Sequence, residues 1–228
     1  MFFPSKIASI ATTDRVLEVG PGATPFFRSD IFLEKNYDNQ SELVAQSGHV
    51  GLLKTEKPVY KYDGGVFPFK DKEFDYVICS HVLEHVDNAD VFLNEIQRVG
   101  KRGYLEFPTI YYDYVYNFPE HKLFLFYKEG VINWMTKEES GLNQFRSIQK
   151  LFYRTCELGY DDLIQASKDY FFQGFEWFEK IESRRVTDIN LLTFKGDDIL
   201  LSPKNRQPNF AKISLKEHLK FKVKNLLK

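Results

Sequence analysis

The chain has 228 residues, of which 43% are hydrophobic and 28% charged, a balance typical of a globular domain that excludes a disordered chain. The formal net charge of −1 leaves no basic field for nucleic acid, and two cysteines cannot build a disulfide framework. No apolar stretch approaches the roughly 20 residues of a membrane-spanning helix, and the N-terminal apolar run is too short for a signal peptide. We therefore expect a soluble, cytoplasmic protein that does not bind nucleic acid.

The first half of the chain alternates short apolar runs with polar or helical segments, which is typical of βαβ units and a parallel sheet. The expected strands are Arg15–Val19, Ile31–Leu33, Val59–Tyr62, Phe74–Ser80 and Gly103–Phe107. After Asn88, a favourable N-cap residue, apolar side chains recur every three or four positions. This spacing predicts a helix between the fourth and fifth strands.

The second half is rich in aromatic residues. Residues 104–134 hold 11 of them, and Pro108 and Pro119 interrupt the pattern, which predicts a long irregular segment rather than a helix. The stretches Tyr170–Phe178 and Val186–Phe194 read as a late antiparallel pair of strands.

No internal repeat or low-complexity linker divides the chain. We expect one domain over residues 1–211, with an aromatic-rich lid inserted at about 108–135. Residues 212–228 carry six lysines around an apolar face and predict a basic amphipathic helix. Such a helix either makes weak peripheral contact with an anionic membrane or docks on its own domain.

A glycine loop follows the first strand. Gly20 and Gly22 let backbone approach a ligand that a Cβ would block. Pro25 stands where a dinucleotide-binding loop has its third glycine, and it removes a backbone N–H that a pyrophosphate needs. The loop therefore favours a ligand without a pyrophosphate, such as S-adenosylmethionine.

Acidic residues stand at three successive strand ends, which meet at one edge of a parallel sheet. Glu34 can accept hydrogen bonds from both ribose hydroxyls, and Asp63 can accept them from the adenine amino group. Glu18 can order the glycine loop or meet the ammonium group of the ligand. These groups match the polar parts of S-adenosylmethionine.

Three runs between residues 15 and about 110 carry a family resemblance: RVLEVGPG, YDGGVFPFKDKEFDYVICSHVLEHV and EIQRVGKRGYLEFP. Together they resemble the class I S-adenosylmethionine-dependent methyltransferases, in particular the group with D-G-x-x-P-F and L-E-H-V motifs. The resemblance implies an α/β, Rossmann-like fold. Its mostly parallel sheet would have seven strands, helices on both faces and an antiparallel last strand.

The same resemblance implies the cofactor contacts. Gly20 and Gly22 would contact the methionine portion and ribose, and Glu34 the ribose hydroxyls. Asp63 and Gly64 would lie near the adenine. Ser80, together with His81, would lie beside the sulfonium.

The segment His81-Val82-Leu83-Glu84-His85 matches HxxEH, a zinc metalloprotease motif. Because the methyltransferase pattern already accounts for this segment, we predict no metal. His81 and His85 are instead candidate catalytic proton acceptors, as is His121 in the aromatic segment. The alternative is that these histidines pack locally or only border the cofactor.

The expected function is methyl transfer to a small-molecule polar acceptor, leaning towards O-methylation of a sugar or similar metabolite. The tyrosines of residues 108–135 offer flat faces with hydroxyls, and the Asn/Asp-Pro-Pro-Tyr motif of many amino-group methyltransferases is absent after the fourth strand. The alternatives are a non-catalytic binding protein of this fold and a nicotinamide oxidoreductase, which Pro25 disfavours.

Overall fold

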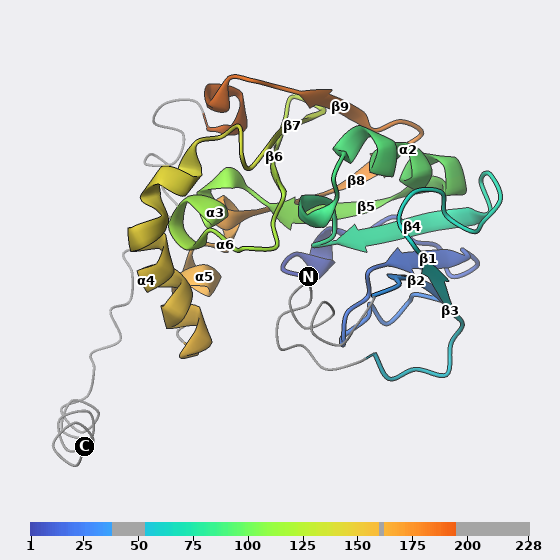
Figure 1. Ribbon diagram of the computed structural model, residues 1–228. Coiled ribbons are helices and arrows are strands. Elements are labelled where there is room, and N and C mark those ends of the chain that lie inside the picture. The colour runs from blue at the N-terminus through green and yellow to red at the C-terminus, as the bar shows by residue number, and fades with distance from the viewer. Residues whose placement is uncertain (38–52, 160–161, 195–228) are drawn as a thin grey trace, which may run out of the picture. The chain divides into compact units, whose positions relative to one another are not determined.

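The computed structural model describes residues 1–37, 53–159 and 162–194, and Figure 1 shows the arrangement of their elements. The predicted C-terminal helix at 212–228 lies outside the described residues. Within them, no helix is both long and apolar enough to cross a membrane.

The main sheet has six strands in the described residues, in the order β3-β2-β1-β4-β5-β8. These strands are β1 (Val16–Val19), β2 (Ile31–Lys35), β3 (Val59–Tyr62), β4 (Phe74–Ser80), β5 (Gly100–Pro108) and β8 (Phe172–Phe178). All neighbours run parallel except β8, which pairs antiparallel with β5. The Rossmann-like α/β fold with an antiparallel last strand is thus confirmed, with six described strands where seven were expected.

The aromatic segment is more regular than predicted. It contains helix α3 (Ile110–Tyr116) and a hairpin of β6 (Leu123–Lys128) and β7 (Val131–Thr136). The expectation of an irregular segment is wrong because Glu129 and Gly130, both with positive φ, allow a tight turn between two apolar strands. Side chains of both strands belong to the main core, so the predicted lid at 108–135 includes part of that core.

The predicted late pair of strands is also wrong. β8 pairs with β5 instead, and β9 (Glu182–Arg185) pairs parallel with β7. Residues 186–194 form no strand and contain the 3₁₀ turn η4 (Ile189–Leu192). Phe172, Gly174 and Trp177 of β8 are buried, whereas β9 is polar, has no buried residue and pairs with β7 through its backbone.

Different elements cover the two faces of the main sheet. Helix α2 (Ala89–Val99) lies over one face together with the β6-β7-β9 sheet (Figure 1). Its predicted cap is confirmed, because the Asn88 side chain accepts a hydrogen bond from the backbone N–H of Val91. On the other face, Ile7, Ile10 and other residues near the N-terminus pack on the sheet.

The remaining helical elements are short, apart from α4 (Arg146–Glu157), which packs against α3. The others are α5 (Asp162–Ala166) and α6 (Lys168–Phe171), and the 3₁₀ turns η1 (Pro4–Lys6), η2 (Leu83–His85) and η3 (Leu142–Phe145). The turn η2 follows β4 directly and packs against β6. It holds the histidine-containing segment at the sheet edge.

Candidate active site

A cavity of about 960 Å³ lies at the carboxyl ends of β1 to β4. Of the residues predicted to bind a cofactor, those that line it are Glu18, Gly20, Gly22, Glu34, Gly64 and Ser80. The three histidines proposed as catalytic, His81, His85 and His121, line it as well. The cavity lies where ligands bind in open α/β sheets, since the strand order reverses between β1 and β4.

The glycine loop after β1 has the backbone geometry that the sequence predicted. Gly20 has a φ of +64°, and its N–H donates to the carbonyl of Leu33 at 2.8 Å. A Cβ on Gly20 would lie 2.4 Å from Cγ2 of Val82. Gly22 has a φ of +56°, and a Cβ there would meet no protein atom within 4 Å. The first glycine lets β1 approach the segment after β4, and the second leaves space open in the cavity.

Glu18 joins this loop to the next segment. Its carboxylate accepts hydrogen bonds from the Phe26 N–H at 2.9 Å and the Ser29 hydroxyl at 2.6 Å. Burial outweighs these bonds and raises the pKa of Glu18 to about 7. The carboxyl group thus orders the loop from within the cavity wall.

We expect Glu18→Gln to gain stability relative to the wild type as the pH rises. Below the usual glutamate pKa of 4.5, both folded and unfolded chains are protonated and burial imposes no ionisation penalty. The penalty grows as the pH rises towards 7 and is constant above it, at about 3 kcal/mol. Urea unfolding at pH 5 and pH 8 measures this change in the difference between variant and wild type.

Glu138→Gln is the matched control, because Glu138 is exposed. Its stability difference from the wild type should be the same at both pH values. An equally constant difference for Glu18→Gln would contradict the prediction.

Glu34 and Asp63 differ in their placement. Glu34 lies in the cavity wall, accepts from the Tyr37 hydroxyl at 3.3 Å, and has a pKa raised by burial. Asp63 is exposed, is not among the lining residues, and accepts from the Asn36 side chain at 2.7 Å. Its neighbours Tyr62 and Gly64 do line the cavity. The adenine contact of Asp63 therefore stays a prediction.

Glu106 is a buried acceptor that the sequence analysis missed. It lies on β5, is 1% exposed, and accepts hydrogen bonds from Tyr104, Ser80 and His81 at 2.6, 3.0 and 2.9 Å. The backbone N–H groups of Phe2 and Phe3 also donate to it, at 2.7 and 2.9 Å. The signal was a glutamate in an apolar strand, Gly103 to Phe107.

His81 has a strained backbone, with a φ of +58° for a non-glycine residue. Its Nε2 atom lies 2.9 Å from Glu106, and its Nδ1 lies 3.5 Å from Glu84. Burial lowers the pKa of His81, but the two carboxylates outweigh burial and raise it to about 9. His81 is therefore held as a cation between two acids, which does not favour the predicted role as a proton acceptor.

Aromatic rings form one wall of the cavity. Phe2 stacks on Phe172, with ring centroids 3.8 Å apart, and both rings lie edge-on to His81. Tyr112 of α3 stacks on Phe118 at 5.0 Å. These rings come from the N-terminal segment, from α3 and the loop after it, and from β8, so the wall is assembled from distant parts of the sequence.

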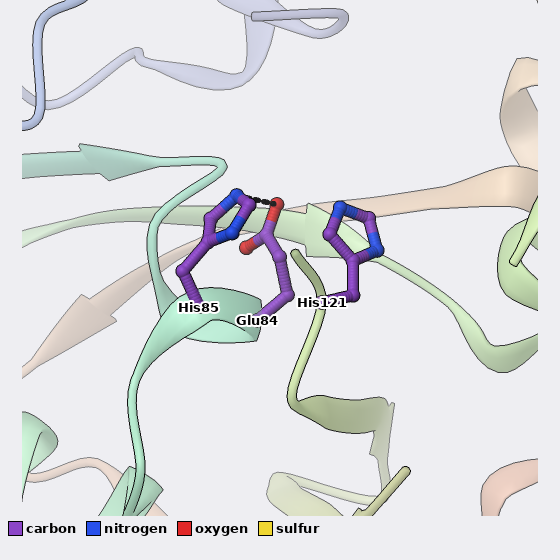
Figure 2. Close-up of side chains that lie close together, drawn as sticks. All are labelled: Glu84, His85 and His121. Carbon is purple, nitrogen blue, oxygen red and sulfur yellow. Dashed lines mark ion pairs between the residues drawn. The ribbon is translucent and has the colours of Figure 1, made fainter. Parts of the chain in front are cut away.

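Glu84, His85 and His121 form a cluster on the same cavity. One ligand atom from each lies within 4.8 Å of the others, and Figure 2 shows the Glu84 carboxylate between the two imidazole rings. Burial raises the pKa of Glu84, but the hydrogen bond from His81 and the nearby histidine charges lower it to about 2. The Lys122 N–H donates to the Glu84 carbonyl at 2.7 Å and so fixes the segment of His121 beside η2.

Comparison with known proteins finds a family model and a relative that each match part of the chain. Residues 38–106 match the family model of the methyltransferase domain. A stretch of 53 residues is 40% identical to the bifunctional methionine biosynthesis protein MetXA/MetW of Rhodopirellula baltica, and it covers 23% of this chain but only 8% of that protein.

Solved structures that match part of this chain include the YcgJ protein from Bacillus subtilis (20% identity, TM-score 0.34, 49% of this chain and 53% of that one). An S-adenosylmethionine-dependent methyltransferase from Mesorhizobium loti is 12% identical, with a TM-score of 0.40 over 76% of this chain and 95% of that one.

The family match confirms the resemblance to class I S-adenosylmethionine-dependent methyltransferases that the sequence motifs carry. Proteins of this family use S-adenosylmethionine as methyl donor. The matched residues run from before β3 to β5 and include the ends of β3 and β4 at the cavity.

Proposed function

We propose that this protein transfers the methyl group of S-adenosylmethionine to a hydroxyl of a small polar acceptor, such as a sugar or a similar metabolite. One observation carries the proposal: the glycine loop, Glu18, Glu34 and Ser80 line a single cavity at the edge of a methyltransferase-type sheet. The cavity of about 960 Å³ is large enough for a nucleoside-containing donor together with a small acceptor.

The donor fits the side of the cavity formed by β1, β2 and β3. Glu34 at the end of β2 can accept hydrogen bonds from both ribose hydroxyls, and the open space at Gly22 leaves room for the methionine portion. The buried carboxyl of Glu18 offers a counter-charge for the donor ammonium. Binding of that ammonium would favour the ionised carboxylate and lower the raised pKa of Glu18.

The acceptor fits the other side, against the aromatic wall. Tyr112 and Phe118 present flat faces there, and Glu120 and Lys122 add charged groups to the lining. Rings of this kind pack on the apolar faces of polar ring substrates. The acceptor-facing part of the predicted lid is therefore the stretch 110–122, and the hairpin that follows supports it from the core.

Methyl transfer requires the acceptor oxygen, the methyl carbon and the sulfur to lie in line, so the main task of the protein is to position two ligands. A hydroxyl must also lose its proton as the oxygen–carbon bond forms. The acceptor end must supply either a proton acceptor or a positive charge that lowers the hydroxyl pKa. His85 and His121, predicted as catalytic from the sequence, lie at that end.

The donor half of the proposal is tested by calorimetry with S-adenosylmethionine and with NADH. We expect S-adenosylmethionine to bind and NADH not to bind. Glu34→Gln should weaken donor binding at least tenfold, because a charge-assisted hydrogen bond is worth about 1.5–3 kcal/mol. Glu138→Gln, on the exposed surface, should bind the donor as the wild type does.

The acceptor half is tested by following S-adenosylhomocysteine formation with a panel of sugars, sugar phosphates and nucleotide-linked sugars. Turnover with a hydroxyl acceptor supports the proposal. Donor binding without turnover on any hydroxyl or amine would favour a non-catalytic binding protein, and binding of NADH alone would favour an oxidoreductase.

A further inference from the structure

We propose that Glu84, His85 and His121 bind a divalent transition-metal ion at the acceptor end of the cavity. The three residues come from two separate segments, η2 after β4 and the loop before β6. All three line the cavity, so a cation could reach them from solvent. The sequence analysis predicted no metal, because the methyltransferase pattern already accounts for the HxxEH segment.

The orientation of both imidazoles favours metal binding. His85 directs Nδ1 to the carbonyl of Glu120 at 3.1 Å, and a carbonyl oxygen can only accept a hydrogen bond. The proton of neutral His85 therefore lies on Nδ1, and Nε2 keeps its lone pair. That Nε2 atom lies 3.9 Å from the Glu84 carboxylate. Figure 2 shows it directed towards the carboxylate.

His121 is oriented in the same way by a different partner. Its Nδ1 lies 2.7 Å from the buried carboxylate of Asp113, on α3. Its Nε2 is turned towards Glu84 from the side opposite His85 (Figure 2). Metal-binding histidines almost always donate their second ring N–H to a carboxylate or a backbone carbonyl, and this cluster has one of each.

Glu84 has an unused acceptor. Its side chain is 1% exposed, and its Oε2 atom has no hydrogen-bond partner among the described residues. A buried polar atom without a partner is costly, and a bound cation would satisfy it. Ligand atoms about 2 Å from a tetrahedral zinc ion lie about 3.3 Å apart. The three ligand atoms lie within 4.8 Å of one another, so only small side-chain rotations are needed to bring them to this spacing.

Two imidazoles and one carboxylate select the class of ion. This set is used for catalytic Zn²⁺ and for Fe²⁺, and imidazole ligands disfavour Mg²⁺ and Ca²⁺ relative to first-row transition metals. Three protein ligands leave at least one position open for water or for an acceptor oxygen.

The role of the ion rests on the proposed function. An acceptor hydroxyl bound to the cation would release its proton to solvent more readily. The oxygen lone pair would then form the bond to the methyl carbon as the carbon–sulfur bond breaks, and that electron pair would return to sulfur. The cluster would thus supply the positive charge that the acceptor end requires.

The test uses the untagged chain of 228 residues after dialysis against a chelator. Co²⁺ is titrated with visible absorption as the readout, and Zn²⁺ by calorimetry. We expect one equivalent of either ion per chain, with absorption bands of nitrogen- and oxygen-ligated Co²⁺. His85→Gln and Glu84→Gln should each weaken binding at least tenfold. Asp113→Asn, which removes the carboxylate that faces Nδ1 of His121 but no proposed ligand, should weaken it about 10- to 100-fold.

The matched control replaces the two histidines that belong neither to the HxxEH segment nor to the proposed metal site. His49 and His218 lie outside the described residues, and the double variant His49→Ala, His218→Ala should bind Co²⁺ as the wild type does. Circular dichroism of each variant shows whether it is folded. If a ligand variant does not fold, the wild-type Co²⁺ spectrum still decides, since its absence overturns the proposal.

Binding that His85→Gln leaves unchanged, or that the double control variant abolishes, would also overturn the metal site. Calorimetry with S-adenosylmethionine separates this result from a failure of the proposed function. A chain that binds the donor but no cation lacks the metal site only. A chain that binds the cation but not the donor retains the site and refutes the methyltransferase proposal.

Discussion

Gly20→Ala is expected to lower the free energy of unfolding by about 3 kcal/mol and to weaken donor binding more than tenfold. A φ of +64° costs a non-glycine residue about 1–2 kcal/mol, and the new Cβ would lie 2.4 Å from Cγ2 of Val82. Val82 is β-branched and cannot move this methyl group aside by a simple rotation. The glycine loop would therefore shift away from the segment after β4. Urea unfolding and calorimetry with S-adenosylmethionine measure the two effects.

Gly130→Ala is the matched control for backbone strain. Gly130 has a φ of +83° in the β6–β7 turn, and a Cβ there would meet no atom within 4 Å. We expect this variant to lose only about 1 kcal/mol and to bind the donor normally. Equal losses of stability in the two variants would show that the contact with Val82 has no energetic weight. Unchanged donor affinity in Gly20→Ala would remove the loop from the binding site.

Glu106→Gln is expected to lower the free energy of unfolding by about 3–5 kcal/mol, and the melting temperature by roughly 10 °C. The buried carboxylate accepts from five hydrogen-bond donors, and an amide has only one acceptor oxygen for them. The side-chain nitrogen of glutamine is itself a donor, so it would face some of these five donors without forming a hydrogen bond. Calorimetric melting of both proteins measures the loss.

The change should also reach the acceptor wall. Phe2 is held by Glu106 through its backbone N–H and stacks on Phe172 beside His81. Release of this segment should raise the KM for the acceptor more than the Kd for the donor. Glu73→Gln, which breaks the partly exposed Arg15–Glu73 ion pair, is the control and should cost less than 1 kcal/mol. A Glu106→Gln variant as stable as this control would refute the role of Glu106 as a buried anchor.

Local sequence determined the elements of the donor side. Strands β1 to β5 are apolar runs that end at turn residues, and Asn88 caps α2 with its own side chain. Gly20 and Glu34 were predictable because the carboxyl ends of adjacent parallel strands must meet at one sheet edge. For this half of the cavity, the order of the strands and their apolar pattern were nearly sufficient to predict which residues line it.

The acceptor side was decided by tertiary structure. The β6–β7 hairpin could not be distinguished from an irregular aromatic segment by sequence. Its strands lack a clear alternation of apolar and polar residues and are stabilised by packing on the core. His121 lies beside Glu84 because the Lys122 N–H pairs with the Glu84 carbonyl, and Phe2 reaches the site through Glu106. Contacts between residues so far apart in the chain depend on how the segments outside the main sheet pack against it. The sequence therefore determined the fold and the cavity wall formed by the glycine loop and Glu34, whereas only the packing of distant segments assembled the aromatic wall and the Glu84-His85-His121 cluster.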